Sequence, residues 1–234
     1  MDLYDGIITA ARARLADREP RRWDYVAASA WRDAGDSAFI MQRDAAFELG
    51  GSDCPSVNFT CITSDERLVP HDEILLYGKD LPELHGDAAF ARLAFLLSDD
   101  LGDDEAAYQA IRDMSFVKYH VFPEGYMVRT SAQSNREQVR LSKSAIRRGI
   151  DFRAVGAAYI RGYRKNPHVR RAQLVFITGD AVTPELVAAA ATVDGITQTL
   201  THIMEGLPAD CGSCRFKPIC DTVDGMRELH TRRK

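Results

Sequence analysis

The chain has 234 residues, of which 45% are apolar and 27% are charged, and its formal net charge is −4. This is ordinary globular composition, and no stretch approaches the roughly 20 uninterrupted apolar residues that a membrane helix needs. The acidic net charge argues against wholesale nucleic-acid binding, and the first five residues lack the profile of a signal peptide. We therefore expect a cytoplasmic protein without membrane or nucleic-acid partners.

The first half of the chain is expected to begin with helices and to continue with strands. Leu3, Ile7 and Leu15 share one face of a helix over residues 2–17, and Pro20 follows its end. Further along, the pattern predicts a short helix at 25–32, strands at 39–41, 57–62 and 73–77, and a long helical segment over 87–115 with an acidic loop at 99–105.

The second half alternates strands and helices more clearly. Ser142 is a candidate N-cap of a short helix that ends at Gly149, and Thr183-Pro184-Glu185 is a strong helix start. The expected elements are strands at 126–129, 138–141 and 174–177 and helices at 152–165 and 184–205. The order predicts an α/β fold with layered helices around a mixed sheet. We expect an N-terminal helical extension (1–36), an α/β domain (37–206) and a cysteine-rich metal-binding tail (207–234).

The tail is the most informative part of the sequence for chemistry. Three of the five cysteines, Cys211, Cys214 and Cys220, fall within ten residues. Such clustering in a reducing compartment indicates a metal more than a disulfide framework. Thiolates select zinc or iron–sulfur clusters over hard cations, and we expect an iron–sulfur cluster, most simply 4Fe-4S, with zinc as the alternative. Free or redox-paired thiols are the remaining interpretation.

Three thiolates leave a fourth ligand open, because a closed tetrahedral zinc site needs four. His230 follows Cys220 at a spacing that a short helix can close, although it equally fits a terminal surface position. Cys54 lies in a glycine-rich loop, and Cys61 reads as a buried small hydrophobe on a strand. The fourth ligand is therefore His230, Cys54, Cys61 or no protein residue.

A basic stretch lies between Arg129 and Arg171, although the chain is acidic overall. Solvated helix faces are one interpretation. The functional interpretation is an anion site, for a coenzyme A thioester or an acidic protein partner. The residues predicted for it are Arg147, Arg148, Arg164 and Lys165. Neither a Gly-x-Gly-x-x-Gly nor a Walker loop is present, and there is no hydrolytic motif.

Four short segments in the same order resemble the catalytic β subunit of acetyl-CoA synthase/decarbonylase, the partner of carbon monoxide dehydrogenase. The resemblance covers about residues 47–205. The segments are Phe47-Glu48-Leu49-Gly50-Gly51, Leu76-Tyr77-Gly78-Lys79-Asp80-Leu81, Arg140-Leu141-Ser142-Lys143 and Val175-Phe176-Ile177-Thr178-Gly179-Asp180.

The resemblance implies a cubane-binding site at the tail. In that family the last similar segment is followed by a helix, here expected at 184–205, and then by a Cys-x2-Cys that begins the ligand set of the nickel–iron–sulfur cluster. Cys211 and Cys214 occupy the corresponding place, and Cys220 would be a third ligand. The chain has no Cys-Gly-Cys for nickel, so the expected protein is a truncated relative without the nickel site. The resemblance implies an enzyme or subunit in acyl-CoA or one-carbon transfer; the alternative is a non-catalytic partner-binding module with a structural zinc or cluster.

Overall fold

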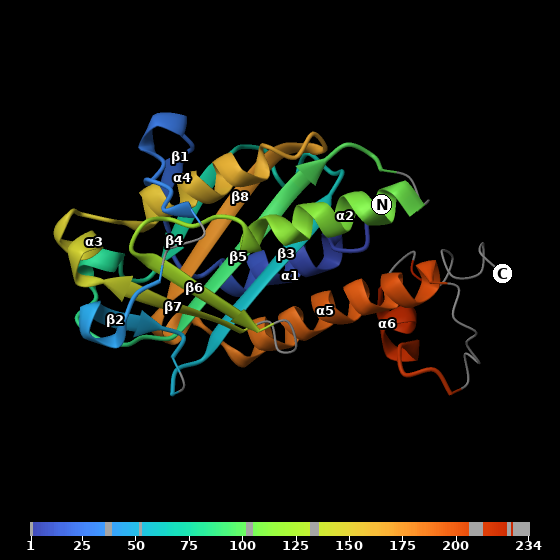
Figure 1. The fold of residues 1–234 in the computed structure, drawn as a ribbon. Coiled ribbons are helices and arrows are strands. Elements are labelled where there is room, and N and C mark those ends of the chain that lie inside the picture. Colours follow the sequence, from blue (N-terminus) through green and yellow to red (C-terminus); the bar gives the residue numbers. More distant parts are fainter. Residues whose placement is uncertain are drawn as a thin grey trace.

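The structure, a computed structural model, describes residues 2–35, 39–51, 53–101, 105–131, 136–205, 213–223 and 226. This part of the chain forms two β-sheets with helices around them (Figure 1). The larger sheet has the order β1 (Arg21–Asp24), β4 (Glu73–Tyr77), β8 (Val169–Thr178), β5 (Phe90–Ser98) and β3 (Ser56–Thr63). The smaller has the order β2 (Ala45–Leu49), β7 (Arg136–Ser142) and β6 (Tyr126–Ser131).

The larger sheet is mixed, as the sequence predicts. β3 runs parallel to β5 and β4 parallel to β8, whereas β5 and β8 are antiparallel, as are β1 and β4. Every residue of β3 and β5 is buried, so these strands are covered on both faces. The α/β prediction is confirmed.

Helices α1 (Asp5–Leu15) and α4 (Phe152–Tyr163) cover opposite faces of the larger sheet. The guanidinium of Arg12 in α1 lies 5.9 Å from the ring of Phe95, whereas the guanidinium of Arg92 lies 4.1 Å from the ring of Tyr159 in α4. Arg92 and Phe95 are three residues apart on β5, and side chains an odd number of residues apart point to opposite faces. The core therefore has a helix layer on each side.

The remaining helices surround the sheets. α5 (Pro184–Met204) packs along β3 and carries α6 (Lys217–Thr222), while α2 (Glu105–Phe116) leads into the 3₁₀ helix η5 (Val117–Tyr119). After β7, the Ser142 hydroxyl accepts a bond from the Ala145 amide at 3.0 Å and caps α3 (Lys143–Arg147). This confirms the predicted cap. None of the helices in the described part of the chain is both long and apolar enough to cross a membrane.

Residues 3–24 pack into the layers. Leu3, Ile8 and Leu15 are buried in the same hydrophobic core as the sheet, and β1 is an edge strand paired with β4. Arg22 of β1 forms an ion pair with the buried Glu73 of β4. Residues 5–24 thus contribute a helix layer and a strand.

Three local predictions are wrong. Residues 90–98 form β5, although they carry a helical signal, because Phe90, Leu93 and Leu97 fit a helical spacing as well as a fully buried strand. Residues 25–32 form only the short 3₁₀ helix η1 (Ala27–Ser29), and residues 39–41 are not a strand. Of the long helical segment predicted over 87–115, only the second half is helical, as α2.

A buried ion pair joins the two sheets through the interior. The Nε of Arg92 in β5 donates to Oε1 of Glu137 in β7 at 2.8 Å, and Nη2 donates to Oε2. The side chains are only 2% and 0% exposed. A bidentate pair offsets the desolvation of both charges only while both partners remain, so this contact fixes the smaller sheet over the face of β5.

We expect Glu137→Gln to lower the free energy of unfolding by about 3–5 kcal/mol, because it leaves the Arg92 charge buried without its partner. Urea denaturation provides the measurement. The double variant Arg92→Met/Glu137→Leu removes both charges and should recover much of the loss.

The matched control is Arg21→Gln, which breaks the half-exposed pair with Glu83 and should cost less than about 1 kcal/mol. A Glu137→Gln variant as stable as this control would contradict the structural role of the interior pair.

Candidate functional site

The structure describes part of the predicted metal-binding tail. Cys211 and His230 lie outside the described residues, whereas Cys214 and Cys220 are both half-buried. The Lys217 amide donates to the Cys214 carbonyl at 3.1 Å, and the Cys220 amide donates to the Phe216 carbonyl at 3.1 Å. Cys214 therefore lies in the turn just before the short helix α6, and Cys220 lies within α6.

Helix α6 is attached to α5 by side-chain packing. A Cβ on Gly195 of α5 would lie 2.5 Å from Cδ1 of Ile219, so this glycine leaves the room that Ile219 occupies. The rings of His202 in α5 and Phe216 in the tail lie 5.2 Å apart. The tail segment with Cys214 and Cys220 is thus held against the last turns of α5.

His202 is a residue that sequence reasoning missed. Its Nε2 atom is buried and has no hydrogen-bond partner in the described structure, and imidazole nitrogen is a common ligand of zinc and iron. The sequence spacing of His202 and the cysteines does not indicate that His202 contacts the tail at Phe216, because this contact results from the packing of α6 on α5. Among the described residues, no three His, Cys, Asp or Glu side chains form a group that could hold a metal ion.

The two remaining cysteines have different environments. Cys61 is 0% exposed, and burial raises the pKa of its thiol well above the ordinary value, which disfavours the thiolate that a metal requires. Cys54 lies in the loop before β3, where its carbonyl accepts a bond from Arg136 at 3.3 Å. The expectation of a buried apolar role for Cys61 agrees with its position.

The four basic residues predicted for one anion site are not brought together. Arg147 and Arg148 precede α4 and Arg164 and Lys165 follow it, and twelve helical residues span about 18 Å. Arg148 pairs with Glu124 at 3.1 Å, and Arg164 pairs with Asp72 at 2.6 Å. Of the four, Lys165 alone lines the groove described next.

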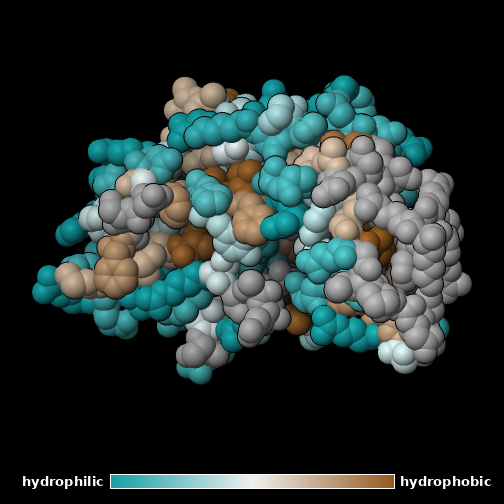
Figure 2. Space-filling view, turned by 45° about the vertical axis from the view of Figure 1, so that its right-hand side comes forward, coloured by the Kyte–Doolittle hydropathy of each residue, from teal (hydrophilic) through white to brown (hydrophobic). Residues whose placement is uncertain are grey.

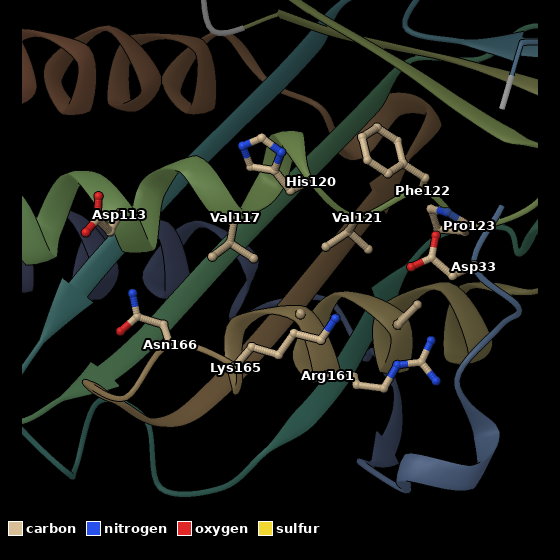
Figure 3. Close-up of a pocket in the computed structure, with 12 residues that line it drawn as sticks. Asp33, Asp113, Val117, His120, Val121, Phe122, Pro123, Arg161, Lys165 and Asn166 are labelled. Carbon is tan, nitrogen blue, oxygen red and sulfur yellow. The ribbon is translucent and has the colours of Figure 1, made fainter. Parts of the chain in front are cut away.

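A groove of about 300 Å³ separates α4 from the segment that follows α2 (Figure 3). Val117 and Val121 form part of its apolar wall, and the groove narrows where a Cβ on Gly162 would lie 2.5 Å from a methyl group of Val121. Arg161, in the last turn of α4, and Lys165, two residues after the helix ends, line its other side.

Charge is divided along the groove. Figure 3 shows Arg161 and Asp33 toward one end, Asn166 and Asp113 toward the other, and Lys165 between them. Arg161 also donates to the Trp31 carbonyl at 3.3 Å. The groove can therefore accept a ligand that has an apolar part and an anionic group near Lys165.

The motifs behind the resemblance have structural contacts here. Glu48 of the first motif accepts from Nε of Arg140 in the third motif at 2.7 Å, which joins β2 to β7. Asp80 of the second motif accepts from the amides of Leu81 at 2.7 Å and Phe152 at 2.8 Å, so one carboxylate caps both the 3₁₀ helix η4 (Leu81–Glu83) and α4. These contacts give Glu48, Arg140 and Asp80 a role in holding the fold together.

A second polar site lies between the two sheets. The Nζ of Lys118, in η5, donates to Oδ1 of the buried Asn58 at 3.0 Å. Burial, and then the charge of Arg92, lowers the pKa of Lys118 to about 8. A lone lysine just after an amphipathic helix gives no sequence signal for this environment, because its neighbours Asn58 and Arg92 come from β3 and β5.

Comparison with known proteins found no family model that matches this chain and no curated protein that matches it significantly.

We expect the stability of the wild type to rise relative to that of Lys118→Met as the pH increases from about 8 to 10.5. In this range the unfolded chain keeps the Lys118 proton and the folded protein loses it, so the cost of the partly buried ammonium disappears. The gain should be on the order of 1 kcal/mol, since the side chain is only half-buried.

Urea denaturation at several pH values measures this difference. Lys165→Met is the control, because Lys165 is exposed at the end of α4. A difference between wild type and Lys118→Met that does not change with pH would contradict the assignment.

Proposed function

We propose that this chain is an iron–sulfur protein that acts as an enzyme or enzyme subunit in acyl-CoA or one-carbon transfer. The observation that carries the proposal is the anchored tail. Cys214 precedes the short helix α6, Cys220 belongs to it, and this helix packs on α5. Cys211, three residues before Cys214, supplies a third thiol in the sequence. When bound, the cluster would supply electron relay or Lewis-acid chemistry.

The thiol set fits iron or zinc better than magnesium or calcium, because thiolates are soft ligands. His202 and His230 are the imidazoles we propose for a fourth position, and Cys61 is the weakest choice because its thiol is fully buried. Free thiols that bind a cluster require a reducing compartment, so we propose that the protein is cytoplasmic.

We propose that the groove, rather than all four predicted basic residues, holds a CoA thioester. Lys165, with Arg161, would bind the phosphates, and the apolar wall at Val117 and Val121 would contact the acyl or pantetheine part. An acidic protein partner is the other anion that this charge fits.

The alternative is a non-catalytic partner-binding module with a structural zinc or cluster. The ion pairs of Arg148 with Glu124 and Arg164 with Asp72 favour it, because these cations already have structural partners. On the face shown in Figure 2, hydrophobic side chains appear as small patches between hydrophilic ones, so a docking partner there would need polar contacts.

Anaerobic purification with iron, sulfide and zinc analysis separates these possibilities. We expect iron and sulfide in equal amounts and broad visible absorption in the wild type, and loss of both in Cys214→Ser. Cys54→Ser is the matched control and should keep the cluster.

One zinc per chain without sulfide would favour the alternative. Protein free of iron and zinc after this preparation would overturn both forms of the proposal.

Coenzyme A binding, measured by calorimetry, tests the groove. We expect Lys165→Gln to weaken binding about tenfold, which corresponds to about 1.4 kcal/mol, because it removes a charge-assisted contact to phosphate. Arg147→Gln is the control, since Arg147 is exposed on α3 and outside the groove. An equal effect of both variants, or no binding by the wild type, would contradict the groove as the CoA site.

A further inference from the structure

The larger sheet ends in two edge strands that differ in their exposure. β3 is buried along its whole length, whereas three of the four residues of β1 are exposed, namely Arg21, Arg22 and Asp24. An edge strand offers unpaired backbone N–H and C=O groups to a further strand. β1 is therefore the edge of this sheet that another chain can reach.

The hydrogen bonds to β4 show which backbone groups of β1 point outward. The Tyr25 amide donates to the Asp72 carbonyl at 3.0 Å, in the same antiparallel register that pairs β1 with β4. Hydrogen-bonded positions alternate with non-bonded ones in such a pair, so Trp23 also bonds to β4. The backbone groups of Arg22 and Asp24 therefore point away from β4, and no strand in the described part of the chain pairs with them there.

The side chains of these two residues make β1 complementary to itself. Arg22 and Asp24 are two positions apart, so their opposite charges lie on one face of the strand. The Arg22 side chain is 59% exposed, and only one of its guanidinium nitrogens pairs with Glu73. Asp24 is exposed and forms no ion pair with another described residue. When β1 is turned about a two-fold axis at Trp23, each arginine lies opposite the aspartate of the second copy, so charges that would repel most strands attract this one.

The same axis also satisfies the backbone. With Trp23 opposite Trp23 of the second copy, Arg22 and Asp24 of the second copy form a hydrogen-bonded pair, and the backbone groups of both point outward. A register shifted by one residue would set outward groups opposite inward ones, so the bonds would be lost. A register shifted by two residues would keep the bonds but would set Arg22 or Asp24 opposite its own copy. Backbone and charge therefore select the same register.

An exposed apolar residue extends this pairing. Val26 follows β1 in an extended conformation, with φ −129° and ψ 116°, and it is 46% exposed. In the register centred on Trp23, Val26 lies opposite the half-buried Pro20 of the second copy. The pairing thus also covers apolar surface beyond the ends of the strand.

We propose that the protein forms a two-fold symmetric homodimer in which β1 pairs antiparallel with β1 of a second copy, centred on Trp23. The larger sheets of the two copies, each with five strands, become one continuous sheet across this isologous interface. Because each copy contributes only a short strand, the dimer dissociates at micromolar concentrations. The interface is independent of the metal-binding tail and of the groove.

Sedimentation velocity over about 1 to 200 μM protein measures the association, in a thiol reductant so that the cysteines cannot crosslink the chains. We expect a concentration-dependent dimer of the wild type. Asp24→Arg should weaken it at least about tenfold, because it sets two positive charges opposite each other at both ends of the strand pair. The matched control is Asp53→Arg, which makes the same change of charge at an exposed residue in the loop before β3 and should leave the dimer unchanged.

A mixture of two variants tests the register. Arg22→Asp alone sets like charges opposite each other, as Asp24→Arg does, but a heterodimer of the two variants has opposite charges at both ends. We expect the mixture to associate about as tightly as the wild type, with the fold of each variant checked by circular dichroism. A wild type that is monomeric over the whole range, or a dimer that Asp24→Arg weakens no more than Asp53→Arg does, would overturn the proposal. Two folded variants that fail to associate with each other would overturn the register.

Discussion

The structure depends on one buried contact, the bidentate pair of Arg92 and Glu137. It connects the interior strand β5 of the larger sheet to β7 of the smaller one, and both side chains are almost fully shielded from water. The pair also affects neighbouring side chains. The Tyr159 ring stacks on the Arg92 guanidinium, and the positive charge of Arg92 lowers the pKa of Lys118 on the same face of the sheet. The same contact thus holds the two sheets together and sets the electrostatic surroundings of Lys118.

Much of the fold is predictable from local patterns. β4 and α5 follow the expected ranges closely, because an apolar run and a Thr-Pro-Glu start are local signals. β5 was not predictable in this way. The apolar residues from Phe90 to Leu97 have a spacing that also fits a helix. The segment forms a strand because it pairs with β3 and β8, which are distant in the sequence.

The candidate sites also differ in whether their residues are neighbours in the sequence. The cysteine spacing of the tail is visible in the sequence because its residues are neighbours in the chain. The contact of His202 with Phe216 and the approach of Lys118 to Asn58 join residues 14 and 60 positions apart, so no short motif announces them. The basic residues show the opposite error: closeness in sequence suggested one site, but Arg148 lies before α4 and Lys165 after it, so the length of the helix separates them.

The glycine at position 162 has a consequence for how the groove can change. Its missing side chain is what allows α4 to approach Val121, so the width of the opening is set by one hydrogen atom in place of a methyl group. Any larger residue there would push the two walls apart and occupy the space itself. Variation in ligand size would therefore be accommodated at the two charged ends, where side chains are longer and can rearrange, and not at the narrow middle.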